Sequence, residues 1–292
     1  MTEVAARPNA LVAGLRPLRV LTAIARTVAT LLVLFALFVY VTPIIWMMLA
    51  SFKPANDILS SRFSVLPETW DLNAYVQIVT GGFLTYIANS ALVSAVSTIA
   101  TTLLAVLAAY GFSRHRFRGR RPAMVAIILS QLVPFVVLVT PIYFLYSRLG
   151  LADSLGGLVL AYTAVGLPFA VYMLLGYINT VPISLDEAAR IDGAGTLAVL
   201  FRIIAPVTWP GIVTVAIYSF TRNWEEYLLA SALISTNGNK TLPVALAGLF
   251  GEFTTQWEVV MAAATISTLP TLIVFLVLQK RLVGNLTMGA IK

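Results

Sequence analysis

Two short polar stretches carry most of the side chains in this chain that could do chemistry. The first is Arg222-Asn223-Trp224-Glu225-Glu226-Tyr227, which places three ionisable groups in or near the end of an apolar segment. Charged groups at membrane depth are costly and are tolerated mainly when they are paired or face water. Carboxylates and amides bond hydroxyl groups, while indole and phenol rings stack on sugar rings. This chemistry predicts a polar pathway for a hydroxylated solute, lined by Asn223, Trp224, Glu226 and Tyr227.

The same stretch has a second interpretation. Arg222 and Glu226 are four residues apart, so their side chains could pair along one face of a helix. The group would then lie at the outer membrane interface as a local ion pair and would line no pathway. The sequence leaves both interpretations open.

The second polar stretch, residues 184–194, is a charged segment between two apolar ones. Pro182 should end the preceding helix, and Ser184 with Glu187 has the spacing of a capping box. Gly193 can adopt the left-handed conformation that ends a helix. These signals predict a short, rigid helix that a soluble partner could grip. The alternative is an amphipathic turn that rests on the membrane surface.

Other chemistry finds little support. The chain has no cysteine, no phosphate-binding G-x-x-x-x-G-K-[ST] motif, and one histidine, His115, which sits among arginines. We therefore predict no catalytic site, no metal site and no cofactor bound by this chain. An intramembrane enzyme with Glu225 and Glu226 as catalytic acids is the alternative from another class. A second alternative is an ion-coupled carrier, which would leave the helix at 184–194 without a purpose.

Composition places the chain in a membrane. Hydrophobic residues make up 59% of it and charged residues 11%. A helix needs roughly 20 apolar residues to cross the ~30 Å of hydrocarbon in a bilayer. Six segments meet this requirement, at residues 27–50, 86–112, 123–146, 155–178, 207–234 and 258–279.

The net charge of +7 is distributed as membrane topology requires, so it does not indicate nucleic-acid binding. Basic residues gather in alternate loops, which orients a membrane protein with those loops in the cytoplasm. The cytoplasmic side then holds both termini and these residues: Arg7, Arg16, Arg19, Arg26, Arg114, Arg116, Arg118, Arg120, Arg121, Arg190, Arg202, Lys280, Arg281 and Lys292.

Two patterns indicate how the spans are built. Small hydroxyl residues recur at every fourth position of the second span: Ser90, Ser94, Thr98 and Thr102. Such a face lets a neighbouring helix approach closely, so we expect it to be a packing surface, with a solute-lining role as the alternative. Prolines interrupt the third and fourth spans, at Pro134, Pro141 and Pro168. Each removes a backbone donor and is expected to kink its helix.

The sequence resembles a known family at the second polar stretch. Glu187-Ala188-Ala189 followed by Asp192-Gly193-Ala194 is similar to the EAA loop of ABC importer membrane subunits. The wider similarity is to the carbohydrate-import branch, which includes the G subunit of the maltose transporter. It extends over most of the chain: Ser51-Phe52-Lys53, Asn89-Ser90, Ala109 to Arg114, Thr140-Pro141, Asn223 to Tyr227 and Gly284 to Lys292. This resemblance implies an all-α polytopic protein with six transmembrane helices, in the type I ABC importer permease fold.

In this family the EAA helix docks in a cleft of an ATP-binding subunit and transmits its opening and closing. The resemblance therefore assigns coupling to Glu187, Ala188, Ala189, Asp192 and Gly193. It implies as partners two ATP-binding subunits that hold ATP and Mg²⁺, a second homologous permease and an extracytoplasmic solute-binding protein. It also implies a bacterial or archaeal inner membrane. The solute is expected to be a sugar, with a polyol or a glycerol phosphate as the alternative.

The same resemblance divides the chain into parts. Residues 1–26 are expected to be a cytoplasmic segment, 27–281 the transmembrane domain with a coupling loop at 179–206, and 282–292 a cytoplasmic tail that docks on the ATPase. Two outward segments, 51–84 and 235–257, are expected to meet the binding protein. A contact with that protein is expected at a loop before the last span: Gly251, Glu252, Phe253, Thr254, Thr255 and Gln256.

Overall fold

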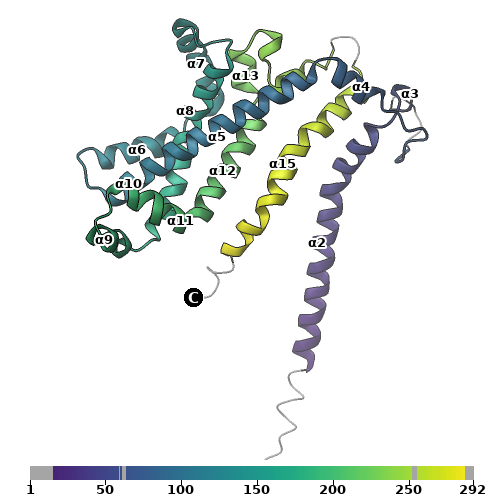
Figure 1. Cartoon of the computed structure of the whole chain (residues 1–292). Coiled ribbons are helices and arrows are strands. Elements are labelled where there is room, and N and C mark those ends of the chain that lie inside the picture. Colours follow the sequence, from purple (N-terminus) through teal and green to yellow (C-terminus); the bar gives the residue numbers. More distant parts are fainter. Residues whose placement is uncertain (1–15, 59, 61–63, 252–254, 287–292) are drawn as a thin grey trace, which may run out of the picture.

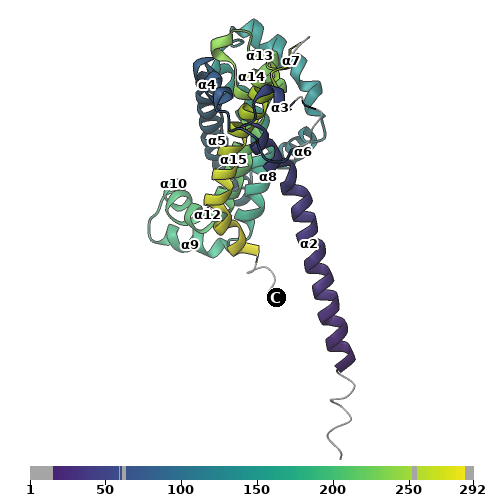
Figure 2. The same cartoon turned by 90° about the vertical axis from the view of Figure 1, so that its right-hand side faces the viewer.

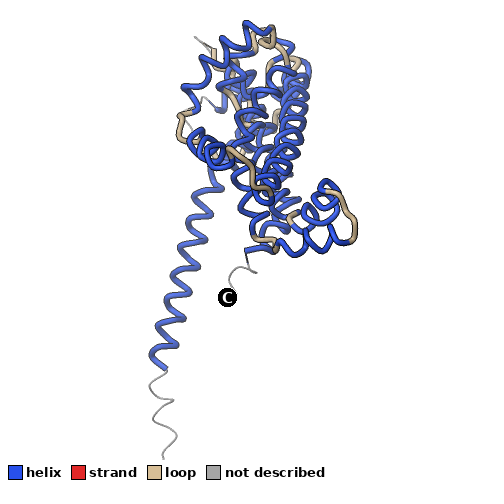
Figure 3. The backbone as a smooth tube through the Cα atoms, turned by 90° about the vertical axis from the view of Figure 1, so that its left-hand side faces the viewer, coloured by secondary structure: helices blue, strands red, loops and turns tan. Residues whose placement is uncertain are grey.

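Within the residues that the structure describes, every regular element is a helix (Figure 3). The computed structural model describes the backbone of residues 16–58, 60, 64–251 and 255–286, and the side chains of those ranges between residues 24 and 277. Four helices are long and apolar enough to cross a membrane: α2 (Arg16–Ala50), α5 (Phe83–Arg114), α8 (Leu155–Asn179) and α15 (Trp257–Leu286). They correspond to the predicted first, second, fourth and sixth spans.

Two further spans are bent. Helices α6 (Arg120–Ser130) and α7 (Phe135–Leu149) meet at 106°, and Pro134 stands immediately before α7. This confirms the expected interruption at Pro134, whereas α7 and α8 continue through Pro141 and Pro168. The second bent pair joins residues 196–207 to α12 (Trp209–Trp224) at 81°. With each pair counted as one span, the described residues contain six.

The predicted fifth span, 207–234, is not one continuous helix, and on this point the prediction was wrong. Helix α12 ends at Trp224, and α13 (Leu228–Leu233) begins after a break. The first amides of a new helix lack partners within it. Here the Glu226 carboxylate accepts hydrogen bonds from the amides of Leu229, at 2.8 Å, and Ala230, at 3.0 Å. The acidic side chain therefore stabilises a break that hydropathy alone does not indicate.

Shorter elements lie at the two ends of the bundle (Figure 1, Figure 2). They are α3 (Ala55–Ile58), α4 (Asn73–Thr80), α9 (Ile183–Ile191), α10 (Thr196–Val199), the π-helical turn η1 (Leu200–Ile204), α11 (Ala205–Val207), the 3₁₀ turn η2 (Asn237–Asn239) and α14 (Leu242–Ala247). Helices α9 and α10 lie at one end, together with the beginning of α2 and the end of α15. Helices α7, α13 and α14 lie at the other end.

The centre of the bundle is the contact between α5 and α8. The hydroxyl stripe of α5 is buried, with Ser90 at 2% and Ser94 at 1% exposure, which confirms its prediction as a packing surface. Gly166 of α8 lies against Thr101, since a β-carbon added to this glycine would stand 3.6 Å from the threonine methyl. Small residues on both helices therefore let their backbones approach closely.

Helix α2 stands apart from this centre (Figure 1, Figure 2). None of the most apolar part of its 24–50 span is buried within the chain. It joins the rest of the molecule at its end, where Ala50 and Ser51 are fully buried. There the Ser51 and Tyr75 hydroxyls are 2.7 Å apart.

Helices α8 and α12 meet at Gly211, and this contact gives a first prediction. A β-carbon at Gly211 would lie 2.7 Å from two carbons of the Tyr177 ring. Because the ring body cannot swing away as a flexible tip would, Gly211→Ala should lower the free energy of unfolding by about 1–3 kcal/mol. Thermal unfolding in detergent measures the loss. Gly176→Ala is the matched control, since a β-carbon there meets nothing within 4 Å; equal stability of the two variants would contradict the prediction.

Candidate functional site

Helix α9 begins at Ile183. The residue before it, Pro182, has an extended backbone (φ −57°, ψ 136°) and is the N-cap of the helix. No side chain caps its N-terminus, so the predicted capping box at Ser184 and Glu187 is wrong. The motif requires Ser184 as the N-cap and a helix that begins at Leu185, but α9 begins two residues earlier, which puts Ser184 inside the first turn. The end of the helix is as predicted. Gly193 has φ +85°, and its amide donates to the Arg190 carbonyl at 3.0 Å.

Helix α9 is fixed to the rest of the protein through Asp186, which is buried at 3% exposure. Its carboxylate accepts a hydrogen bond from the Tyr110 hydroxyl at 2.9 Å and an ion-paired one from Arg114 Nε at 3.1 Å. Both partners belong to the last turns of α5. The link therefore connects the short helix directly to a membrane-spanning helix.

The same turn of α5 also holds the chain that leads into α9. Arg114 Nη2 donates to the Val181 carbonyl at 2.8 Å, and the Ser113 hydroxyl donates to the Asn179 side chain at 2.7 Å. The side chains of Arg114 and Asp186 are only 5% and 4% exposed, respectively. Taking two charges out of water is costly unless their remaining hydrogen-bonding groups are also satisfied. Here they are, so the anchor formed by Tyr110, Arg114 and Asp186 can be rigid.

Sequence reasoning missed this anchor. The sequence places Arg114 among the basic residues that set topology, which does not point to a partner in a later loop. The available signal was a tyrosine and an arginine four residues apart at the end of the second span, with acidic residues in a short helix two spans further along the chain. Their pairing joins residues 72 positions apart, which no local pattern reveals.

The predicted coupling residues divide between two faces of this region. Ala189 is buried at 6% exposure and packs in the cluster that contains Ile178 and Leu200. The other four are exposed: Glu187, Ala188, Asp192 and Gly193. Large apolar side chains are also exposed here, namely Ile183 (57%), Leu185 (41%), Ile191 (86%) and Leu197 (63%). The region thus combines acidic and apolar groups on a surface that the anchor holds in place.

The residues predicted to line a solute pathway have separate partners in the helix bundle. The Asn223 amide donates to Ser97 of α5 at 2.8 Å, and the Trp224 indole donates to the Ser267 carbonyl of α15 at 3.0 Å. Both side chains are buried between helices, whereas Tyr227 is 43% exposed. The Glu226 carboxylate caps α13 and accepts a further bond from the Tyr162 hydroxyl at 2.8 Å.

The ion pair between Arg222 and Glu226 that the spacing suggested is absent. Arg222 instead lies over the Phe135 ring, 5.3 Å from its centre. A guanidinium group is attracted to the face of an aromatic ring, so this contact replaces the expected one. Arg222 thereby packs against the break between α6 and α7.

The loop before α15 is described in part. Glu252, Phe253 and Thr254 lie outside the described residues, while Gly251 and Gln256 are exposed. The segment that precedes it is held by polar contacts. The Asn89 amide of α5 donates to the carbonyls of Gly238 and Lys240 at 2.9 and 3.0 Å.

Asp153, in the loop before α8, fixes the same segment. Its carboxylate accepts bonds from the Thr236 hydroxyl at 2.5 Å and from the Thr236 and Ser235 amides at 2.9 Å. The Thr236 hydroxyl, and after it the two amides, lower the pKa of Asp153 to about 2. Asp153 also has a left-handed backbone, with φ 56°. Aspartate and asparagine tolerate this conformation better than other non-glycine residues.

The second prediction follows from this lowered pKa. A carboxyl group whose pKa is lower in the folded state stabilises the fold above its unfolded pKa, about 3.8, and loses that contribution as the pH falls through about 2. Wild type should therefore be more stable than Asp153→Asn at pH 5, and the difference should fade between pH ~4 and ~2. Thermal midpoints of both proteins across this range measure it. Asparagine keeps the left-handed backbone, so a difference that does not change with pH would contradict the prediction.

With this geometry in view, comparisons with known proteins identify the family. The family model described as "Binding-protein-dependent transport system inner membrane component" matches residues 101–287. The inner membrane ABC transporter permease protein YcjP of Escherichia coli (strain K12) is 35% identical over 262 residues, which are 88% of this chain and 94% of the relative. The trehalose transport system permease protein SugB of Mycobacterium tuberculosis (strain CDC 1551 / Oshkosh) is 33% identical over 253 residues, 86% of this chain and 92% of the relative.

A solved structure has the same fold. It is the crystal structure of a bacterial ABC transporter involved in the import of the acidic polysaccharide alginate. One of its chains matches with a TM-score of 0.77 at 24% identity, covering 96% of this chain and 99% of that one. This chain therefore belongs to the inner membrane components of binding-protein-dependent transport systems, and it is a multi-pass ABC transporter permease subunit, not itself an enzyme, with the type I importer fold.

Proposed function

We propose that this chain is one of two permease subunits of an ATP-driven importer for a sugar, and that it receives the force of ATP hydrolysis through α9. The single observation that carries this proposal is the anchor of Asp186 to Arg114 and Tyr110 of α5. A helix that merely rested on a membrane surface would have no need of a buried ion pair to a spanning helix. A push on α9 would move the end of α5 with it.

The exposed face of α9 supports docking to an ATP-binding subunit. Small residues at Ala188 and Gly193 allow a partner to approach, and Glu187 and Asp192 can meet basic groups on it. Two ATP-binding subunits would hold ATP and Mg²⁺, since this chain has no phosphate-binding loop. The tail at 284–292 would add a second contact with them.

The proposed topology places α9 and both termini in the cytoplasm of a bacterial or archaeal cell. Two observations support it. The basic residues gather in the loops of that side, and the beginning of α2 and the end of α15 lie at the same end of the bundle as α9 (Figure 1). The opposite end, with segments 51–84 and 235–257 and the loop 251–256, would face the solute-binding protein.

The sugar assignment is supported by what relatives carry. A relative in Mycobacterium tuberculosis is described as a trehalose permease, and the similar structure takes part in the import of a polysaccharide. Of the residues proposed to line the pathway, Tyr227 is the exposed one, while Asn223 and Trp224 would have to be uncovered by a movement of α5 or α15. A polyol or a glycerol phosphate is the alternative solute.

The test is uptake by vesicles that contain the complete transporter with its own binding protein. Labelled trehalose and other disaccharides, a polyol and glycerol phosphate are offered in parallel, each with ATP or a non-hydrolysable analogue inside the vesicle. We expect uptake of a sugar that requires both ATP and the binding protein. Uptake that persists without the ATPase and follows an ion gradient would instead favour an ion-coupled carrier.

A further inference from the structure

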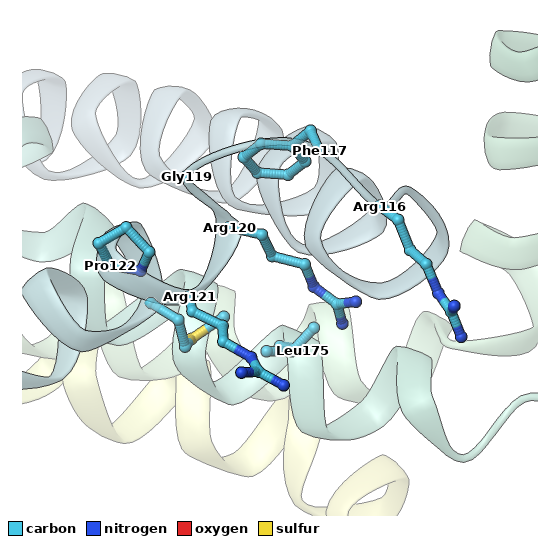
Figure 4. A pocket seen from close by; sticks show the side chains of 8 residues that line it. Arg116, Phe117, Gly119, Arg120, Arg121, Pro122 and Leu175 are labelled. Atoms are coloured by element: carbon cyan, nitrogen blue, oxygen red, sulfur yellow. The ribbon is translucent and has the colours of Figure 1, made fainter.

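A large cavity lies at the start of α6. Its volume is about 910 Å³, and it is lined by the loop before α6, by the first turns of α6 and by Leu175 of α8. Three arginines border it: Arg116, Arg120 and Arg121. Figure 4 shows the guanidinium groups of Arg120 and Arg121 near Leu175, with Arg116 to one side.

The positive charge of this cavity is not balanced by the protein. No acidic side chain lines the cavity, and among the described residues none of the three arginines forms an ion pair. Helix α6 begins at Arg120, so the positive end of its dipole adds to the same field. Three like charges round one space repel one another, and an anion between them would remove that cost. Guanidinium groups bind phosphate with two parallel hydrogen bonds, which makes phosphate the matching anion.

One wall of the cavity is apolar, and this restricts the class of ligand that would fit it. Phe117, Pro122 and Met124 line it together with Leu175, and Phe117 is 48% exposed. A free phosphate ion would make no use of these side chains. A ligand that carries both a phosphate and hydrocarbon would use the whole site.

The surface of α6 continues this apolar wall. Val125, Ile128 and Leu129 follow Arg121 at the spacing that places side chains on one helical face. All three are exposed, at 53%, 45% and 53%. An acyl chain could therefore run along α6 from a headgroup that is held at its N-terminus. Basic pockets between membrane helices bind anionic lipid headgroups in this way.

We infer that the cavity formed by Arg116, Arg120 and Arg121 binds an anionic phospholipid, with its phosphate among the guanidinium groups and an acyl chain along α6. The site lies outside the coupling surface and outside the proposed solute pathway. It gives the basic loop a binding role in addition to its effect on topology.

The experiment measures lipid bound to the complete purified transporter in nanodiscs, by native mass spectrometry. The discs contain phosphatidylcholine with increasing phosphatidylglycerol or cardiolipin. The variant Arg120→Gln/Arg121→Gln is compared with Arg118→Gln/Arg202→Gln, which removes the same charge from two exposed arginines that do not line the cavity. We expect at least a tenfold weaker retention of the anionic lipid in the first variant and no change in the second.

Four results would overturn the inference. Equal loss in both variants would mean that only general positive charge attracts the lipid, and equal retention in both would mean that the cavity is not the site. If inorganic phosphate displaced the lipid at low millimolar concentration, the site would be one for free anions. If the first variant does not fold, the wild-type transporter is titrated separately with phosphatidylglycerol and with phosphatidylcholine. Half-saturation of the site at the same concentration of both lipids would refute selectivity for the anionic one. Lipid binding is measured without transport, so failure here leaves the proposed function untouched.

Discussion

Arg114→Leu should destabilise the protein by about 3–5 kcal/mol and abolish the link between ATP hydrolysis and uptake. The variant leaves the Asp186 carboxylate buried, at 4% side-chain exposure, with only the Tyr110 hydroxyl as a partner. An uncompensated buried charge costs this much because it is removed from water without its counter-ion. Helix α9 should then detach from α5. The measurements are thermal unfolding of the purified complex, and uptake and ATPase activity in the same vesicles.

The control is the double variant Arg114→Leu/Asp186→Leu. It removes both charges, and replacement of a buried ion pair by apolar residues is often neutral or stabilising. We expect it to recover most of the stability that the single variant loses. Tyr110→Phe should cost less than Arg114→Leu, since it removes one hydrogen bond and leaves the ion pair. If the double variant were as unstable as the single one, the pairing of Arg114 with Asp186 would not be what holds α9.

Gly193→Pro should abolish uptake while the protein still folds in the membrane. Gly193 has φ +85°, whereas proline fixes φ near −65°. Proline also removes the amide that bonds the Arg190 carbonyl at 3.0 Å. The end of α9 must then change course, and with it the exposed surface proposed to meet the ATPase. Uptake in vesicles, together with ATPase activity stimulated by the binding protein, measures the effect.

Gly195→Pro is the matched control for this variant. Gly195 has φ −71°, which is already within the range that proline imposes, and a β-carbon there meets nothing within 4 Å. We expect Gly195→Pro to keep most of the wild-type uptake, and Gly193→Ala to fall between the two. Unchanged uptake in Gly193→Pro would count against coupling through the end of α9.

Features that depend on local chemistry could be predicted from the sequence. Long apolar runs predicted the spanning helices, because a helix needs such a run to cross a bilayer. Pro134 predicted the break between α6 and α7, and Gly193 predicted the end of α9. Each of these residues has a backbone preference that its neighbours rarely override. The hydroxyl stripe of α5 was assigned to packing on size alone, and its burial confirms this.

Features that depend on distant partners could not be predicted. Glu226 was recognised as costly in a membrane, but its use as a cap for α13 requires knowing where the backbone opens. The capping box failed because α9 begins directly after Pro182, two residues before the start that a cap at Ser184 would need. The anchor joins α5 to α9, and the partners of Asn223 and Trp224 lie on other helices. Such pairings follow from the packing of the bundle and leave no periodic trace in the sequence.

The most direct test of the central claim is whether an ATP-binding subunit copurifies with this chain through α9. The tagged chain is expressed from its native gene cluster, as wild type and as Glu187→Arg/Gly193→Pro, with Gly195→Pro as the control. Glu187 is exposed, so its replacement should leave the anchor on the buried side intact. Docking at α9 predicts that an ATPase subunit is retained by wild type and by Gly195→Pro but lost from the double variant. An ATPase retained equally by all three, or absent from folded wild type, would contradict it.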